Sequence, residues 1–278
     1  MISRNDKAIQ FQALHEEPET FVIPNPWDAG SARILAALGF KALATTSAGF
    51  AFTLGRRDGA GLVSRDEMLA HCRTIVEATD LPVSADLENC FGDDPATVAE
   101  TIRRAADVGL VGGSVEDATG DPSRPIYDFE HAVERVAAAV EAARSLPFPF
   151  TLVARAENFL HGRNDFDDTL RRLQAFAEAG ADVLYAPCLP SLVEIRTVCA
   201  AVAPHPVNAL AARKGDGLTV ENLAAAGVRR ISLSTSLYRA AITGLLAAAR
   251  EVRERGTFGY VENLVSGGEL GKYLRPAS

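Results

Sequence analysis

Residues 79–94 read "TDLPVSADLENCFGDD", an apolar run that brings the carboxylates Asp86 and Glu88 to its end. Short β-rich runs like this one alternate with longer Ala/Leu/Arg/Glu stretches at helical spacing along the chain. The expected strands are 20–25, 41–46, 82–88, 111–117, 150–157, 182–187, 206–211 and 229–235. The expected helices are 28–38, 64–79, 95–108, 128–145, 165–179, 190–202, 219–226 and 236–255.

Eight strands that are each followed by a helix predict parallel pairing and an α/β fold of the (β/α)₈ TIM-barrel type. A doubly wound open sheet would show a similar alternation, but it would carry a Gly-rich phosphate fingerprint. "GLVGGS" (109–114) opens a strand rather than a helix, which makes it a poor match. We therefore expect a single barrel domain over residues 1–278. The tail after about residue 256 is expected either to pack on a neighbouring subunit or to be a loose end.

The composition is that of a globular protein, with 47% of residues hydrophobic and 23% charged. A net charge of −8 argues against nucleic acid as the main partner, since phosphate binding needs a basic surface. No apolar run approaches the ~18 residues of a membrane span, so we expect a cytoplasmic protein without a membrane partner. The four cysteines show neither CxxC pairs nor zinc spacing, which favours free thiols.

Carboxylates gather at the ends of neighbouring expected strands, where a barrel places its active site. Asp86 and Glu88 end the third strand, two residues apart and so expected on one side of it. Glu116 and Asp117 end the fourth strand. Because like charges repel, a hard divalent cation would relieve this cluster, and we predict Asp86, Glu88 and Glu116 as direct or water-mediated Mg²⁺ ligands. The alternative for these acids is solvated strand ends with capping or salt-bridge roles.

Arg155 lies within the apolar run "FTLVARAE" (150–157) and needs a partner charge if it is buried. A substrate carboxylate can bond to its guanidinium in bidentate fashion. The alternative is an internal salt bridge with Glu157 or Glu116.

Six motifs in the order of the chain make the sequence similar to the isocitrate lyase/phosphoenolpyruvate mutase superfamily over nearly its whole length. They are "PNPWDAGSARI" (24–34), "TTSAGFAFTLGRRDG" (45–59), "SADLENCFGD" (84–93), "VGGSVEDATGD" (111–121), "LVARAEN" (152–158) and "ISLSTSLYRAA" (231–241). The resemblance implies a (β/α)₈ barrel in a homotetramer, a dimer of dimers, whose C-terminal helix is exchanged between subunits. It also implies Mg²⁺, with Mn²⁺ as a substitute, and a small 2-oxo- or 2-hydroxy-carboxylate at the barrel mouth.

The resemblance also assigns roles to individual residues. Asp86, Glu88 and Glu116 fall on the family's metal-binding acids, with Glu88 in place of a more common Asp. Asp58 falls on an acid that supports the metal, and Arg155 on the arginine that binds the substrate carboxylate. The implied catalytic residues are Arg155, Glu116 and Asp58. The implied substrate-binding residues are Ser47, Ala48, Asp86, Arg155 and Asn208.

The loop after the fourth strand departs from the family pattern. Lyases of this superfamily carry K-[KR]-C-G-H there, whereas this chain reads "EDATGDPSRPIYDF" (116–129). Ser123 and Arg124 are the candidate replacements. Cys90 stands at a position that normally holds Gly and is not carried over as the lyase cysteine.

The sequence therefore predicts an Mg²⁺-dependent carbon–carbon lyase, including a decarboxylase, that acts on a small 2-oxo- or 2-hydroxy-di- or tricarboxylate through an enolate. The alternatives are a phosphonomutase or phosphonopyruvate hydrolase, and a 2-oxo-acid-binding protein without turnover. His161, Tyr185 and Glu157 are candidate proton carriers. The alternative for His161 is an exposed loop residue without a role in the reaction. Trp27 is expected either to wall the pocket or to pack in the core.

Overall fold

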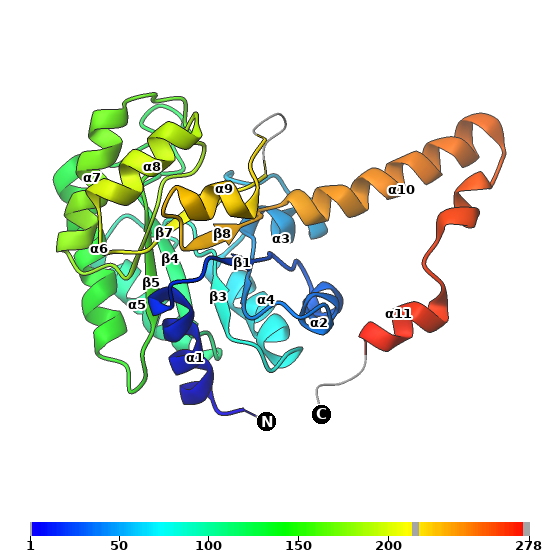
Figure 1. Ribbon diagram of the computed structural model, residues 1–278, viewed down its shortest axis with the longest axis horizontal. Helices are drawn as coiled ribbons and strands as arrows, with labels where there is room; N and C mark the ends of the chain where they lie inside the picture. The colour runs from blue at the N-terminus through cyan, green and yellow to red at the C-terminus, as the bar shows by residue number, and fades with distance from the viewer. Residues whose placement is uncertain (1, 213–216, 275–278) are drawn as a thin grey trace.

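Eight parallel strands form the centre of the molecule in the computed structural model, which describes residues 2–212 and 217–274. The strand order is β1-β8-β7-β6-β5-β4-β3-β2, and each neighbouring pair is parallel. Helices surround this sheet on the outside (Figure 1). The strands are β1 (Phe21–Ile23), β2 (Leu43–Ala44), β3 (Val83–Ala85), β4 (Gly112–Glu116), β5 (Thr151–Arg155), β6 (Val183–Tyr185), β7 (Val207–Leu210) and β8 (Arg230–Ser232). The prediction of a (β/α)₈ TIM-type barrel is confirmed, since the sheet curves into a nearly closed cylinder.

The seam of the cylinder lies between β1 and β2. The backbone N–H of Ala44 donates to the carbonyl of Pro24 at 3.1 Å. The buried side chain of Asn25 donates to Thr45 O at 3.0 Å and accepts from the Leu233 N–H at 2.9 Å. Since Pro24 has no N–H to donate, a side-chain amide joins the ends of β2 and β8 at this point.

All eight predicted helices are present, within two residues of the expected ends. They are α2 (Ala29–Ala37), α4 (Arg65–Glu77), α5 (Pro95–Asp107), α6 (Phe129–Arg144), α7 (Phe166–Glu178), α8 (Leu192–Ala201), α9 (Val220–Ala225) and α10 (Ser236–Arg255). Local capping explains several boundaries: Asp28 and Ser64 each open a helix with a capping box, and Asp94 caps α5 just before Pro95.

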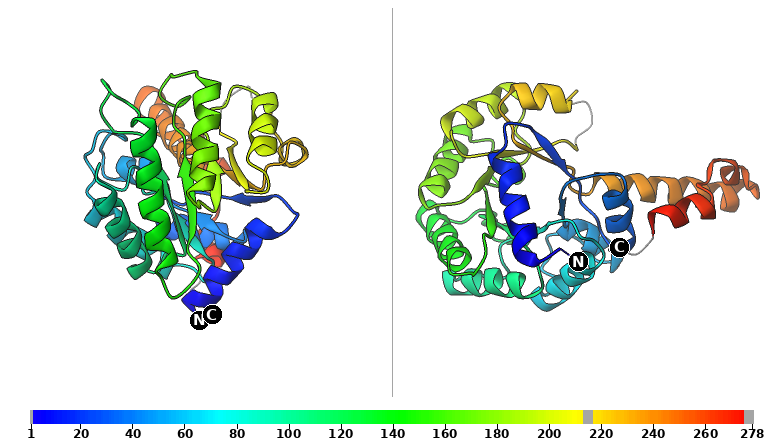
Figure 2. Two further views of the ribbon diagram at one scale, coloured as in Figure 1. Left: turned by 90° about the vertical axis from the view of Figure 1, so that its left-hand side faces the viewer. Right: turned by 60° about the horizontal axis from the view of Figure 1, so that its bottom comes forward.

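An additional helix, α1 (Arg4–Glu16), crosses the amino-terminal end of the barrel (Figure 2, right). Arg4 and Lys7 anchor it by donating to Ala106 O and Thr79 O, both at 2.9 Å and both at the ends of barrel helices. Its Phe11 is fully buried against Gly112, where a Cβ would come within 2.8 Å of the Phe11 ring. Helix α1 therefore packs across the end of the barrel opposite the expected active site.

The strands are shorter than expected, which corrects the placement of three carboxylates. β3 ends at Ala85 and β5 at Arg155, so Asp86, Glu88 and Glu157 lie beyond the strand ends. Glu88 has a φ of 51° in the left-handed region, so strand alternation does not orient its side chain.

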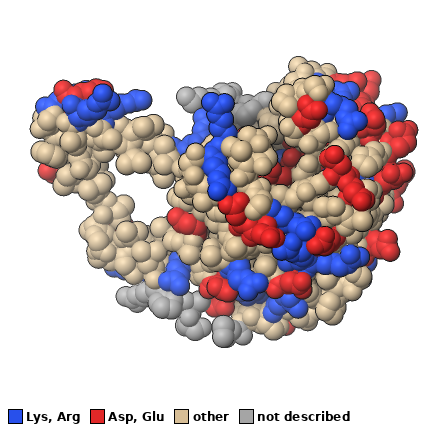
Figure 3. All heavy atoms as spheres, turned by 180° about the vertical axis from the view of Figure 1, so that it is seen from behind, with Lys and Arg blue, Asp and Glu red and all other residues tan. Residues whose placement is uncertain are grey.

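The C-terminal segment leaves the barrel as an arm. Helix α10 projects from the body, a 3₁₀ turn (Gly259–Asn263) reverses the chain, and α11 (Gly267–Tyr273) returns towards α2 (Figure 1). No residue of α10 is buried. Much of the arm surface carries neither acidic nor basic side chains (Figure 3), and Leu245 and Leu246 on α10 are 61% and 47% exposed.

Candidate active site

Arg155 is the centre of a charged cluster at the carboxyl end of the barrel. Its Nε donates to Glu157 at 2.7 Å, and its Nη1 contacts Asp86 at 2.8 Å and Glu116 at 3.3 Å. The Arg155 side chain is only 13% exposed, and that of Glu157 is fully buried. The structure thus contains the internal salt bridges that were the alternative interpretation of Arg155, while its Nη2 donates to no other described residue.

Asp86 joins this cluster to the start of the short helix α3 (Ser47–Thr53), which the sequence analysis did not predict. The backbone N–H and the hydroxyl of Ser47 both donate to Asp86 Oδ2, at 3.1 and 2.8 Å. Thr45 Oγ1 accepts from the Asp86 N–H at 3.1 Å. Ser47 is therefore committed to Asp86, and Ala48 follows it in the first turn of α3.

The pKa values of the other acids at the barrel mouth are raised. Burial, and then repulsion from Asp86 and Asp58, raise the pKa of Glu88 to about 7. Partial desolvation, followed by repulsion from Asp86, raises the pKa of Asp58 as well. Burial raises the pKa of Glu116 well above its usual value, although Arg155 opposes this shift. Repulsion from Asp86 contributes to all three shifts, as expected for acids that lie near one another.

The donor set suits a magnesium ion. Carboxylate oxygens are the ligands that Mg²⁺ prefers, and neither Asp58 nor Glu88 forms an ion pair with another described residue. Within residues 2–212 and 217–274, no three His, Cys, Asp or Glu side chains converge closely enough to hold a metal ion by themselves. Mg²⁺ usually keeps several waters and takes one or two carboxylates, so these residues fit a partly hydrated ion.

Arg135 on α6 shapes the loop that carries Glu88, and the sequence analysis missed it. Its side chain is 1% exposed and donates to three backbone carbonyls of the loop, those of Asn89, Gly92 and Asp93. Its guanidinium also lies 4.3 Å from the centre of the Tyr127 ring. An arginine within an Ala-rich helix face was the available signal, because burying that charge requires partners.

A second buried ion pair supports the ends of β4 and β5. Asp117 accepts from the Glu157 N–H at 2.8 Å and from Arg172 at 3.1 Å. Arg172 also donates to Asp168 at 2.8 Å, and Asp168 accepts from Asn158 at the same distance. The predicted strand-end acid Asp117 therefore holds the backbone beside Arg155 rather than facing the mouth.

Asn208 of β7 and Tyr185 of β6 line a small pocket together with Asp86 and Arg155. Asn208 is 2% exposed and donates to Ser232 at 2.9 Å. The Tyr185 ring lies 5.2 Å from the guanidinium carbon of Arg155, and burial raises the pKa of its hydroxyl. Of the three candidate proton carriers, Tyr185 and Glu157 therefore lie beside Arg155.

Other candidates lie outside the cluster. His161 is exposed on the loop after β5. Burial raises the pKa of the Cys90 thiol to about 12, which makes it a poor nucleophile. In the loop 118–129, Ser123 bonds to Asp121 at 2.8 Å. Trp27 is half-buried and packs edge-on against Tyr238 of α10 at 5.5 Å.

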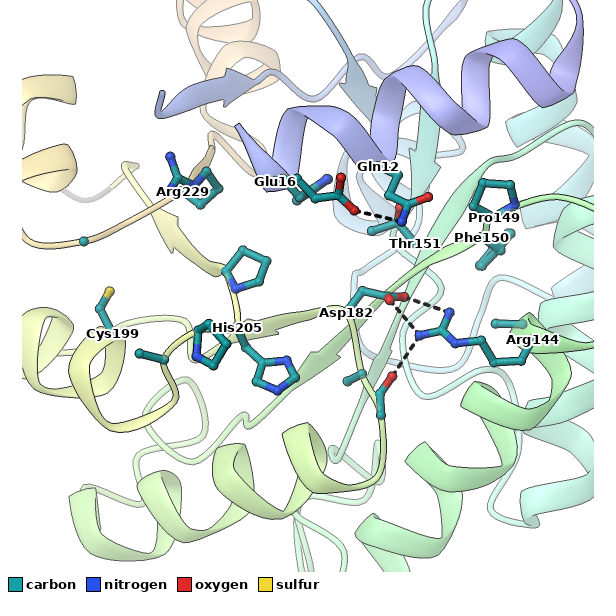
Figure 4. A pocket seen from close by; sticks show the side chains of 18 of the residues that line it. Gln12, Glu16, Arg144, Pro149, Phe150, Thr151, Asp182, Cys199, His205 and Arg229 are labelled. Carbon is teal, nitrogen blue, oxygen red and sulfur yellow. Dashed lines mark hydrogen bonds and ion pairs between the residues drawn. The ribbon is translucent and has the colours of Figure 1, made fainter. Parts of the chain in front are cut away.

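A cavity of about 1290 Å³ opens at the opposite end of the barrel, where β5 to β8 begin (Figure 4). Arg144 and Asp182 form an ion pair at 2.6 Å on its wall, and Gln12 donates to Glu16 of α1. Since active sites of this fold lie at the carboxyl ends of the strands, this cavity is not the candidate active site.

Comparisons with known proteins agree with the barrel fold. The family model for phosphoenolpyruvate phosphomutase matches residues 11–253. A 2-methylisocitrate lyase from Aeropyrum pernix is 27% identical over 251 residues, covering 88% of this chain and 79% of the relative. A crystal structure from Burkholderia cenocepacia J2315, described as a "putative lyase/mutase", is 54% identical with a TM-score of 0.94 and covers 97% of this chain and 96% of that one.

A further solved structure, an oxaloacetate acetylhydrolase in complex with oxalate, is 26% identical with a TM-score of 0.85. It covers 96% of this chain and 93% of that one. No described helix is long and apolar enough to cross a membrane. The family match spans most of the barrel and agrees with the superfamily resemblance of the sequence motifs. This chain belongs to the phosphoenolpyruvate phosphomutase family.

Proposed function

We propose that this protein is a magnesium-dependent lyase that cleaves or decarboxylates a small 2-oxo- or 2-hydroxy-di- or tricarboxylate through an enolate. The observation that carries the proposal is the position of Arg155 among Asp86, Glu116 and Glu157 at the barrel mouth. The names of the relatives support this class of reaction, since they include lyases of 2-methylisocitrate and an acetylhydrolase of oxaloacetate.

The acids would hold the metal. Asp86, Glu88 and Glu116 would bind Mg²⁺, or Mn²⁺ in its place, directly or through water, with Asp58 in support. Once bound, the ion would supply a Lewis acid that polarises the 2-oxo or 2-hydroxy group of the substrate.

Arg155 would bind the substrate carboxylate. Its Nε and Nη1 are occupied by acids, which fixes the guanidinium plane and leaves Nη2 to donate outward. Ala48 at the start of α3 and Asn208 of β7 would position the substrate, while Ser47 keeps Asp86 oriented. A preorganised cation at this point stabilises the negative charge that develops as a C–C bond breaks.

We assign proton transfer to residues at the strand ends, because the loop 118–129 contains no Cys, Lys or His. Burial keeps the Tyr185 hydroxyl protonated, and this hydroxyl is our candidate donor to the enolate carbon. Oε2 of the fully buried Glu157 has no hydrogen-bond partner among the described residues, which makes it the candidate acceptor.

The exposed arm suggests assembly. We infer that α10 packs on another copy of the chain in a homo-oligomer, a dimer of dimers, because a 20-residue helix without buried residues lacks the tertiary packing that normally stabilises a helix. Leu245 and Leu246 are the side chains that such packing would cover.

Turnover of a substrate panel tests the function. The panel contains oxaloacetate, 2-methylisocitrate, isocitrate and phosphonopyruvate, each with Mg²⁺ and then with excess chelator. Chelator-sensitive cleavage of a C–C substrate supports the lyase. Turnover of phosphonopyruvate alone would favour phosphorus chemistry. A B. cenocepacia J2315 structure described as a "putative phosphonomutase" is similar to this chain, with 36% identity and a TM-score of 0.81. The similarity covers 90% of this chain and 99% of that one. Binding of an oxo acid without any turnover would instead indicate a binding protein.

A further inference from the structure

The barrel interior beneath Arg155 is unusually polar. TIM-barrel interiors are mostly filled by Val, Ile and Leu, but the inward positions here include Ser114, Asn208, Arg230 and Ser232. Together with Arg155 they line a small cavity of about 70 Å³. This volume exceeds the about 10–15 Å³ that a single buried water needs.

Arg230 is the least satisfied residue of this cavity. It begins β8, is 6% exposed, and its Nε and Nη1 have no hydrogen-bond partner among the described residues. Ser114 Oγ and Asn208 Oδ1 are also buried without a partner. Since almost all buried polar groups in native proteins are hydrogen-bonded, several orphaned atoms around one cavity indicate a missing partner.

The charge of Arg230 favours an anion over a neutral group as this partner. Arg230 forms no ion pair with any described residue, whereas Arg155 contacts three carboxylates. The Phe11 ring lies 5.8 Å from the Arg230 guanidinium carbon, but an aromatic face accepts no directed hydrogen bond from both Nε and Nη1. A buried guanidinium without a counter-charge is costly. Burial lowers the pKa of Arg230 to about 10; Tyr185 opposes this shift, and the charge of Arg155 adds to it.

We propose that Arg230, Ser114 and Asn208 form a binding site for one small anionic group, a carboxylate or a halide, at the floor of the barrel pocket. Nε and Nη1 lie on different edges of the guanidinium, and either edge, completed by Nη2, matches a carboxylate or one halide ion. The Ser114 hydroxyl supplies a third donor. The Asn208 amide supplies a fourth after a half-turn, since Ser232 Oγ can donate to the amide oxygen as well as accept from its nitrogen.

We expect entry from the barrel mouth. Phe11 of α1 packs beneath Arg230 at the other end of the barrel, whereas Arg155 and Asp86 of the mouth line the same cavity as Arg230. Two sources supply the same chemistry. A free halide can act as a permanent counter-ion, or a substrate can place a second carboxylate on Arg230 while Arg155 binds the first. The first source is independent of the proposed function, and the second depends on it.

Bromide diffraction tests the site directly. Crystals of the full chain are soaked in bromide with a chelator present, so that neither metal nor turnover is needed. We expect an anomalous peak within hydrogen-bond distance of the Arg230 guanidinium. Bromide peaks confined to the outer surface, with water or nothing beside Arg230, would overturn the proposal.

Thermal melting gives a solution test. Chloride replaces a bulky organic anion at constant ionic strength, again in chelator. We expect the melting temperature of the wild type to rise, the rise to disappear in Arg230→Met, and a smaller rise in Ser114→Ala. The matched control is Arg229→Met, which removes a half-buried arginine at the adjacent position but lines the cavity at the other end of the barrel. An equal chloride response in the wild type and both arginine variants would contradict the site. Ser114→Ala keeps the test decisive if Arg230→Met does not fold.

Competition separates the two sources. Dicarboxylates and matched monocarboxylates are soaked against bromide in the same crystals. Loss of the bromide peak beside Arg230 with the dicarboxylate alone assigns the site to a second substrate carboxylate. A peak that persists with both assigns it to a free anion. Because this experiment measures no reaction, its outcome is independent of whether the proposed lyase activity is found.

Discussion

The Nε–H of Arg155 donates a 2.7 Å hydrogen bond to Glu157, a fully buried carboxylate two residues further along the chain. This bond fixes the plane of the guanidinium before any ligand arrives. The same residue therefore carries both stability and the proposed chemistry.

Replacing Arg155 is expected to remove activity and to weaken the fold. Arg155→Ala should lower kcat/KM by about 10²–10³-fold, because a preorganised charge at the reacting group is lost. It should also reduce the free energy of unfolding by about 3–5 kcal/mol, since Glu157 is left as an unpaired buried charge. Turnover and denaturant unfolding measure the two effects. Arg144→Ala, which breaks an ion pair at the other end of the barrel, is the control for activity; wild-type turnover in Arg155→Ala would refute the assignment.

Metal removal should abolish turnover and lower stability. Mg²⁺ that binds only the folded state should raise the melting temperature of the wild type in a concentration-dependent manner. We expect this rise to shrink strongly in Glu88→Gln, because one of the proposed ligands loses its charge. Differential scanning calorimetry with and without chelator measures it. Asp182→Asn, far from the mouth, should keep the full response, and a full response in Glu88→Gln would exclude Glu88 as a ligand.

Arg135 is expected to control the metal loop from a distance. Arg135→Met should cost about 3 kcal/mol of stability, because carbonyls of Asn89, Gly92 and Asp93 lose a charged donor in a buried place. It should also weaken Mg²⁺ binding, measured by calorimetric titration, since the backbone around Glu88 is no longer held. Arg135→Lys should restore part of the binding. Arg103→Met, an exposed arginine on α5, serves as control, and unchanged Mg²⁺ affinity in a folded Arg135→Met would limit Arg135 to stability.

Acid should destabilise the protein through His15. Burial, reinforced by the charge of Arg230, lowers the pKa of His15 to about 3, against about 6.5 in an unfolded chain. The unfolded state therefore binds the extra proton as the pH falls from about 6.5 towards 3, and stability is lost across that window. Between pH 7 and pH 5 the loss from His15 should be about 2 kcal/mol. Urea unfolding at both pH values should show a smaller loss in His15→Leu, while the exposed His161→Leu should behave like the wild type.

The arm should govern the oligomeric state. Leu245→Glu combined with Leu246→Glu is expected to lower the mass measured by light scattering, because charge would be placed in the inferred interface. Arg250→Glu, an exposed residue of the same helix, changes charge without removing apolar surface. An unchanged mass in the double leucine variant would show that α10 does not carry the assembly.

The barrel could be read from the sequence because its signals are local. Strand runs, capping residues such as Asp28 and Ser64, and Gly after α2, α5, α7 and α9 all act within a few positions of the boundary that they set. Helix α1 was missed although Ser3 caps it, because it buries few apolar side chains and its anchoring bonds reach carbonyls about 70 and 100 residues away.

The candidate site was predictable in its composition but not in its geometry. Asp86, Glu116 and Arg155 were expected at neighbouring strand ends, and the structure brings them into contact. The left-handed backbone at Glu88 was not foreseen; the carbonyls that follow it in the loop accept from Arg135, more than forty residues further along the chain. The roles of Asp86, Glu116 and Arg155 in catalysis and metal binding remain predictions.

The seam between β1 and β2 has a further consequence. There the Asn25 amide bonds to Thr45 and Leu233 beside the backbone bond from Ala44 to Pro24, and Thr45 lies two residues before the start of α3. Backbone hydrogen bonds between strands do not depend on which side chain a residue carries, but these two bonds need the side chain of Asn25. A substitution of Asn25 would therefore change how the chain is joined at the seam without changing the sequence of any strand.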